Sequence, residues 1–599
     1  MDDPTPPTEA VSVPDPVAQV PQPEATPEPI GDPAPVGIPA PVAAARVSRA
    51  RWVVAIVVAA VAVAVVLAMP LLFGQSATPT ALQYVPGDAA IVLEVRMDLP
   101  GDQLQHVGNL LAHFPGFADQ STLSTKIDEG MRRLINNATG SSVDYVNDIK
   151  PWLAGPAYVG VMAPALASTS GTSNAVISAT TTGSVACSAV FRNQTVSHES
   201  YRGLDLVTGT QPPLTCVIDG RQALLGDAAT VKLALDAKAN GTGMDKSTRY
   251  ATARSALGED RLATAFVSGP ALASMMPGGS AAPGASTTSA AMVQALTGPV
   301  PDWTMVGLRA EDDALVVDSV AARPNTSTGP DASLGLASLP PTHVSVLAPM
   351  VPKDSLVFVE NQGTGVALAN LFTRLRTIPE LQQPLQTLDG LGGASKLFGW
   401  VDDAGLVVSV DGTNPDGTLL LLAKDEGTAS STVSQLNAVL TLLGQGKIEL
   451  TKTTVDGVEV TTVTIPDPSQ VIPSSELQGL SLPTTPVSFA VAAKGKVILL
   501  ATSATEMSSI LGVTAGNSLA DDPTFKLAGQ HGLANSRTTL YVAAGATVGL
   551  VQRLLPPDQA ASFTSDVLPY LAPLQSVSST ATEDATASRS RFVILVSKP

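Results

Sequence analysis

The chain has 599 residues, of which 44% are hydrophobic, 14% are charged and only 4% are aromatic. Its 52 acidic residues outnumber its 34 lysines and arginines, and the net charge of -18 excludes the basic surface expected of a nucleic-acid-binding protein. Two cysteines and five histidines leave little material for a zinc or haem site, and the apolar share is too high for a wholly disordered chain.

Residues 1–51 form the first distinct segment, and prolines and acidic residues dominate most of it. Such a composition cannot bury enough apolar area to offset the entropy lost on ordering, so we expect a disordered tail with polyproline-II character. The tail is interpreted as a solvated spacer. A docking segment for a proline-recognition domain is the alternative.

The composition changes abruptly at Trp52–Phe73, which contains no charged and no polar side chain. About 20 apolar residues span the hydrocarbon core of a bilayer, whereas the apolar region of a secretory signal is shorter. The N-terminal side of this segment carries three arginines, Arg46, Arg49 and Arg51, and the next basic residue after it is Arg96. The positive-inside rule therefore predicts a single transmembrane helix with residues 1–51 in the cytoplasm and residues 74–599 outside it.

The predicted extracytoplasmic part contains two stretches that resemble each other. Val85–Glu94 and Val351–Glu360 both read V-P-x-D-x5-E, a turn that leads into an apolar strand. Further along, Tyr201–Leu206 matches Val455–Val460, and the stretches that follow run in parallel. Their shared order predicts an internal duplication, with one copy at residues 82–323, a linker at 324–347 and a second copy at 348–598.

Each copy mixes tight hairpins with helices. Asp219-Gly220 and Lys494-Gly495 interrupt strand-like alternation, and glycine accepts the positive φ that a hairpin turn needs. Helical patterns lie between the strands, for example at Ala229–Asp236 and Ala504–Leu511. We therefore predict an α+β fold class with mixed or antiparallel sheets rather than a doubly wound parallel sheet.

A family resemblance rests on these motifs. The V-P-x-D turn, the apolar strand that closes on Glu94, the helix that ends at Phe114-Pro115-Gly116 and the following Pro151-Trp152-Leu153, all after an anchor helix, resemble the bacterial domain-of-unknown-function 3352 family. The resemblance covers most of residues 80–598, and the second copy departs from it at Ile378-Pro379-Glu380. It implies a membrane-anchored extracytoplasmic protein with no assigned activity and offers no catalytic residues.

The search for catalytic motifs yields isolated polar residues only. Gly363-Thr364-Gly365 lacks the third glycine of a dinucleotide loop and is interpreted as a turn. His106 and His113 can share a helix face, but without further ligands they are interpreted as surface or packing residues. The paired acids Asp402-Asp403 and Asp521-Asp522 are interpreted as solvated turns. We predict no catalytic, cofactor-binding or metal-binding residues.

Cys187 and Cys216 both lie in strand-like runs of the first copy. An oxidising compartment permits a disulfide between neighbouring strands, and this is the favoured prediction. A catalytic thiol assisted by His198 is the alternative.

Two classes of function remain. The favoured one is a non-enzymatic binding or scaffold module of the cell envelope, whose partner is an envelope protein or a neutral or cationic polymer, because the acidic chain repels anionic polymers. The alternative is an envelope enzyme or solute receptor whose site is assembled from scattered residues. Convergent acids and histidines in a fold would favour the second class.

Overall fold

The computed structural model describes residues 80–96, 101–117, 153–163, 174–183, 195–210, 214–258, 260–271, 300–323, 336–390, 393–444, 447–468, 486–584 and 586–597, together with single residues and pairs of residues between these ranges. They all belong to the compact unit Val58–Pro599. The predicted tail, the predicted transmembrane helix and the arginines Arg46, Arg49 and Arg51 lie outside the described residues. Within the described part of the chain, no helix combines the length and the apolar character that a membrane span requires.

The first half of the described chain contains ten strands and three main helices. In chain order these are β1 (Ile91–Val95), α2 (Gln103–Leu111), β2 (Leu153–Val161), β3 (Ala175–Thr181), β4 (Val196–Tyr201), β5 (Leu204–Gly209), β6 (Thr215–Asp219), β7 (Gln222–Gly226), α5 (Ala228–Asn240), α6 (Thr248–Leu257), β8 (Ala263–Ser268), β9 (Trp303–Ala310) and β10 (Ala314–Ala322).

The second half, residues 336–597, contains ten further strands and a larger set of helices. In chain order these are β11 (Val357–Gln362), α9 (Thr364–Leu375), α10 (Pro379–Gly390), α11 (Gly393–Phe398), β12 (Val401–Asp411), β13 (Asn414–Ala423), α12 (Glu426–Gly444), β14 (Glu449–Val455), β15 (Val458–Ile465), β16 (Val487–Lys494), β17 (Val497–Ala501), α13 (Ala504–Leu511), α14 (Pro523–His531), β18 (Thr538–Ala543), α15 (Ala544–Leu554), α16 (Pro557–Ser562), α17 (Leu568–Leu571), β19 (Leu574–Glu583) and β20 (Ala587–Val596).

The strands of the two halves follow the same order in the sheet. The first half runs β4-β5-β6-β7-β3-β2-β1-β8-β9-β10. The second half runs β14-β15-β16-β17-β13-β12-β11-β18-β19-β20. All the described pairings are antiparallel, so the fold is α+β with a large antiparallel sheet. The sequence allowed mixed or antiparallel sheets, and the structure has the antiparallel kind.

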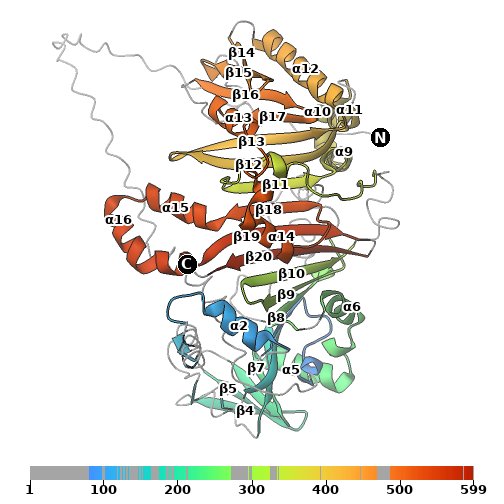
Figure 1. The fold of residues 1–599 in the computed structure, drawn as a ribbon. Coiled ribbons are helices and arrows are strands. Elements are labelled where there is room, and N and C mark those ends of the chain that lie inside the picture. The colour runs from blue at the N-terminus through green and yellow to red at the C-terminus, as the bar shows by residue number, and fades with distance from the viewer. Residues whose placement is uncertain are drawn as a thin grey trace, which may run out of the picture. The chain divides into compact units, whose positions relative to one another are not determined.

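The two halves meet along β10 and β20, which pair antiparallel and make the sheet continuous (Figure 1). Asp318 lies opposite Arg591 at the middle of this pairing, and the Arg591 Nε donates to the Asp318 carboxylate over 2.6 Å. Arg261 and Arg309 contact the same carboxylate at 3.0 and 3.3 Å. Because Asp318 is only 6% exposed, this cluster places a buried charge network at the junction.

Matching hairpins show how the local sequence sets the turns. Arg202-Gly203 joins β4 to β5, and Asp456-Gly457 joins β14 to β15. Both residues of each turn have positive φ, at 51° and 78° in the first turn and 49° and 80° in the second. A type I′ turn requires this combination, which glycine adopts without steric cost.

Equivalent aromatic pairs lie in the two cores. In the first half Tyr250 of α6 packs edge to face on Phe266 of β8, with ring centroids 5.4 Å apart. In the second half Phe525 of α14 packs in the same way on Tyr541 of β18, at 5.1 Å. Helices α6 and α14 therefore cover matching strands, β8 and β18. The larger apolar cluster of each half surrounds its aromatic pair.

Residues 336–347, the described part of the predicted linker, lie along the second half. Asn370 exchanges two hydrogen bonds with the Ala337 backbone, and the Arg537 guanidinium donates to the Pro340 carbonyl. Leu347 ends this segment inside the core of the second half. We call residues 336–347 the strap, because they are bound to the second half at several points.

Candidate functional site

Equivalent glutamates lie on the first strand of each half, at the end of the shared V-P-x-D-x5-E motif. Glu94 of β1 is 3% exposed and Glu360 of β11 is 2% exposed. Each lies opposite a threonine on the neighbouring strand, Thr264 of β8 for Glu94 and Thr539 of β18 for Glu360. Two buried carboxyl groups at matching places require partners, because an unpaired buried charge is costly.

In the first half these partners are complete. The Arg254 guanidinium of α6 forms an ion pair with Glu94 and also donates to the Thr264 hydroxyl over 3.2 Å. The Tyr158 and Thr264 hydroxyls donate to the two Glu94 oxygens at 3.2 and 3.0 Å. Glu94 is therefore a satisfied structural group.

In the second half two of these partners are replaced by glycine. Gly405 lies opposite Glu360 in the sheet, where Tyr158 lies opposite Glu94. Gly529 occupies the place of Arg254, because the two residues lie equally far from the N-caps of their helices, Asp522 for α14 and Ser247 for α6. The acid is kept while its basic partner is not.

A second acid lies beside Glu360 instead. Asp403 of β12 is 1% exposed, accepts a hydrogen bond from the Gly363 backbone over 3.1 Å, and has an ion-pair contact of 3.1 Å with the His343 imidazole. Burial raises the pKa of Glu360, and the nearby Asp403 charge raises it further, against the hydrogen bond from Ser345 and the charge of His343. Burial is also the main cause that raises the pKa of Asp403.

These two acids are incompletely satisfied. Among the described residues, Glu360 Oε1 and Asp403 Oδ2 have no hydrogen-bond partner, although the latter makes the ion-pair contact with His343. Burial and mutual repulsion of this kind favour a proton or a bound cation on the carboxyl groups. Perturbed acids cluster at functional sites, so we take Glu360, Asp403 and His343 as the candidate site.

The strap supplies one side of this site. The His343 backbone exchanges hydrogen bonds of 2.9 and 2.7 Å with the side chain of Gln362, which is the last residue of β11. The His343 side chain is 44% exposed, so it lies between the buried Asp403 and solvent. The segment expected to be a linker therefore contributes a titratable group to the site.

The first half has a separate polar cavity of about 500 Å³ at the start of α6. Its lining includes Lys246 and Arg249 together with hydroxyl groups of the helix N-terminus. Arg249 pairs with Asp302 at 2.9 Å and Lys246 with Asp245 at 3.2 Å. Both cations of this cavity are therefore already paired with acids.

The structure joins Cys187 and Cys216 in a disulfide, with the Cα atoms 5.7 Å apart. Cys216 lies on β6 as expected, whereas Cys187, which was expected in a strand, lies outside the described strands. His198 contacts Asp205 at 2.9 Å across the β4–β5 hairpin. A disulfide sulfur is not a free nucleophile, so the alternative of a catalytic thiol has no support in this arrangement.

The other polar candidates are placed differently from the sequence interpretation. Asp402 and Asp403 lie within β12 rather than in a solvated turn. Asp521 and Asp522 cap helices: Asp522 accepts from the Phe525 backbone at the start of α14. Of the dinucleotide-like glycines, Gly363 forms the turn before α9 with a φ of 75°, whereas Gly365 lies inside that helix, so the expected turn holds only for the first of them.

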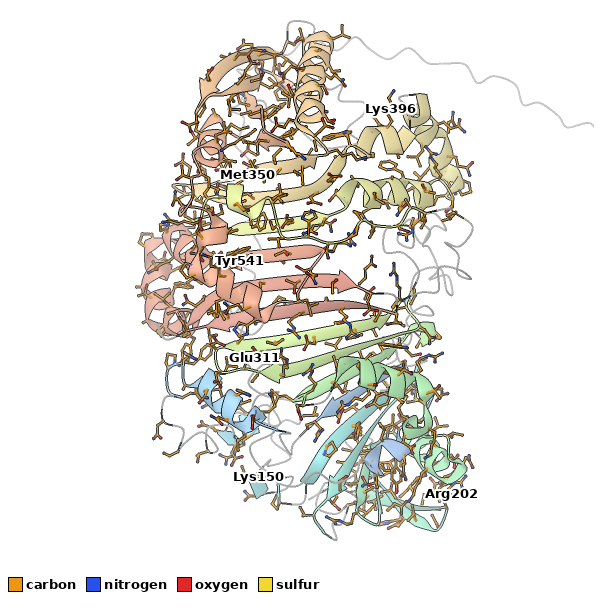
Figure 2. All side chains as sticks on the ribbon, turned by 45° about the vertical axis from the view of Figure 1, so that its right-hand side comes forward. Lys150, Arg202, Glu311, Met350, Lys396 and Tyr541 are labelled. Carbon is orange, nitrogen blue, oxygen red and sulfur yellow. A yellow bond between two sulfur atoms is a disulfide. The ribbon has the colours of Figure 1, made fainter. Side chains whose placement is uncertain are left out.

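The histidines do not share a helix face. His106 lies on α2 and contacts Asp312 at 2.8 Å, whereas His113 follows the end of that helix. His531 contacts Glu311 and Asp313, and the three side chains could place ligand atoms within 4.8 Å of one another. Glu311 lies between β9 and β10, at the end of these two strands (Figure 2). The two ring nitrogens of His531 face different acids, Nδ1 toward Glu311 and Nε2 toward Asp313 at 3.3 Å.

The sequence reasoning identified Glu94 and Glu360 only as strand ends. The missing signal lies in a comparison of the two halves at matching positions: the first has Tyr158 and Arg254 where the second has Gly405 and Gly529, and both have the glutamate. The two glutamates therefore lie at matching places in different surroundings.

Comparison with known proteins supports the family resemblance. A model of the family described as "Protein of unknown function (DUF3352)" matches residues 50–597. No curated protein matches the chain. Crystal forms I and III of TP0453 match at 8% and 11% identity over 42% and 45% of this chain and 82% and 90% of theirs, with TM-scores of 0.21 and 0.22. Likenesses this weak carry no argument about fold or function.

Proposed function

The chain belongs to the family described as "Protein of unknown function (DUF3352)", and from that premise we propose that it is a membrane-anchored, non-enzymatic binding or scaffold module of the bacterial cell envelope. One observation carries the proposal: Glu360 is a buried acid whose equivalent in the first half is neutralised by Arg254. An acid maintained without its internal base is suited to bind an external cationic group. The partner is an envelope protein or a neutral or cationic polymer.

The location is inferred from the sequence. The family match begins at residue 50 and therefore includes the apolar segment Trp52–Phe73. The arginines on its N-terminal side favour a cytoplasmic tail and an extracytoplasmic remainder. The disulfide between Cys187 and Cys216 is consistent with an oxidising compartment.

The repeated strand order supports an origin of the two halves by duplication. The nine strand pairings within each half correspond one to one, and the β10–β20 pairing joins the halves. The glutamate motif occupies the first strand in both. Two equivalent units on one anchor double the surface available for a partner, which raises avidity without new chemistry.

Two experiments test this proposal. A cysteine introduced near Gly329 should react with an impermeant thiol reagent on intact spheroplasts, whereas one introduced near Gly31 should not; the opposite result would overturn the orientation. A pull-down from solubilised membranes with the full-length chain should recover a specific partner, and recovery should fall with Glu360→Gln. Recovery of nothing above an anchor-only control would count against a binding module.

An envelope enzyme or solute receptor is the second candidate, and the pair of acids favours it. The raised pKa values of Glu360 and Asp403, next to the half-exposed His343, are what a general acid would need. Turnover of an envelope substrate that Asp403→Asn abolishes, together with an unchanged fold, would establish this alternative.

A further inference from the structure

We propose that the second half binds the guanidinium group of an arginine side chain from a partner protein at Glu360, in the position that the Arg254 guanidinium occupies in the first half. The inference rests on the proposed binding function and specifies its ligand chemistry. It follows from treating the two halves as two states of one site, one filled by the chain itself and the other open to a ligand.

The first half shows what the site holds. The Arg254 side chain is 24% exposed and reaches from the surface of α6 to the buried Glu94 carboxylate. Its guanidinium contacts both Glu94 and the Thr264 hydroxyl, so one planar group satisfies two acceptors at once. A planar group with several donors makes such contacts better than an ammonium does.

The second half retains the acceptors of this arrangement. Glu360 and Thr539 lie opposite each other on β11 and β18, as Glu94 and Thr264 do on β1 and β8. Gly529 of α14 is exposed, and a Cβ placed on it would meet no atom within 4 Å. The helix surface is therefore open at the point from which Arg254 enters the site of the first half.

The charges around Glu360 favour a cation from outside. Its charged neighbours are the Asp403 carboxylate, which repels its ionised form, and the His343 imidazole, which is already in contact with Asp403. In the free protein, burial and repulsion favour the protonated acid. A bound guanidinium favours the ionised acid, so binding releases a proton and becomes tighter as the pH rises.

The test is titration calorimetry of the full-length chain in detergent with a short peptide. The peptide is acetylated at its N-terminus and amidated at its C-terminus, and a single arginine is its only cation. The wild-type chain should bind this probe, and the same peptide with citrulline, which is uncharged, should not bind. Gly529→Arg should weaken binding at least tenfold because the new side chain occupies the site from within. Glu360→Gln should weaken it to a similar extent.

A matched control separates this effect from added charge. Gly549 of α15 is also a helical glycine whose Cβ would meet no atom within 4 Å, so Gly549→Arg adds the same charge elsewhere. It should leave binding within about twofold of wild type. Thermal unfolding provides a second readout: Gly529→Arg should raise the melting temperature through the new ion pair, and Gly549→Arg should raise it less.

Three results would overturn the inference: absence of binding of the arginine peptide to the wild-type chain, equal binding by Gly529→Arg, or equal binding of the citrulline and arginine peptides. Preferential binding of an otherwise identical lysine peptide would likewise replace guanidinium by ammonium and refute the proposal as stated. A membrane partner that the wild type and Gly529→Arg recover equally would refute this site while leaving the binding module intact. Failure to recover any partner would refute the module, whereas the peptide titration tests the site alone.

Discussion

Replacement of Arg254 by methionine tests whether the acid of the first half depends on its internal base. Methionine keeps the length and helix propensity of the position but removes the charge. Removal of one partner from a buried ion pair costs about 3–5 kcal/mol because the other charge stays buried. Tyr158 and Thr264 still donate to Glu94, and each hydrogen bond to a charged group retains about 1.5–3 kcal/mol, so we expect a loss near the lower limit of about 3 kcal/mol.

Urea unfolding at pH 7, followed by circular dichroism, measures this loss in the full-length chain. Glu94→Gln combined with Arg254→Met removes both charges. The pair should cost only about 1 kcal/mol, because the amide oxygen accepts from one of the two hydroxyl groups and the amide NH₂ donates to the other. Arg249→Met, on the same helix but with its partner at the surface, should cost less than about 1 kcal/mol. A loss below about 1 kcal/mol for Arg254→Met, or a double variant as unstable as the sum of the single ones, would refute the reasoning.

Three further predictions follow from the same structure. Residues 80–335 and 336–599, expressed separately, should form a 1:1 complex in size-exclusion chromatography. Asp318 of β10 lies opposite Arg591 of β20, whereas self-pairing of β10 or of β20 at that position opposes like charges. Arg591→Asp should abolish the complex, and homodimers that persist in its place would contradict the prediction. Cys187 and Cys216, separated by 29 residues, should react with a thiol reagent only after reduction, and reduction should cost about 3–4 kcal/mol in urea unfolding; two free thiols before reduction would rule out the disulfide. Glu360→Gln should raise the melting temperature at pH 7.5 and raise it less at pH 4.5. An acid whose pKa is raised in the folded state lowers stability at any pH above its ordinary pKa, and this cost disappears as the pH falls. Equal gains at the two pH values would show that charge is not the cause.

Local patterns in the sequence predicted the features that depend on neighbouring residues. The turns at Asp219-Gly220 and Lys494-Gly495 follow from glycine placement between alternating strands, and Gly220 and Gly495 both have positive φ. The α+β class follows because hairpins alternate with helices, and the family resemblance rests on the same turn and core residues. The nearness of Cys187 to Cys216 was also predictable, although the position of Cys187 outside the described strands was not.

The paired acids show where local reasoning fails. Asp402-Asp403 reads as a solvated turn because adjacent acids are usually exposed, but β12 carries Asp403 into the interior, opposite Gln362 of β11. The register of that pairing depends on contacts between strands that are far apart in the sequence. The same holds for His343, which the strap brings to Asp403.

The sequence by itself therefore determined the kinds of elements, their order and the family, since hydrophobic period, turn residues and chain order are properties of short segments. Only the tertiary structure decided that β10 and β20 join the halves and that Glu360, Asp403 and His343 converge. It also decided which glutamate has an arginine to neutralise it. Arg254 pairs with Glu94, and Gly529 lies at the matching place near Glu360, but both helix residues are distant from these acids along the chain. The energy of a buried charge depends on what surrounds it in space, and a linear pattern does not specify those surroundings.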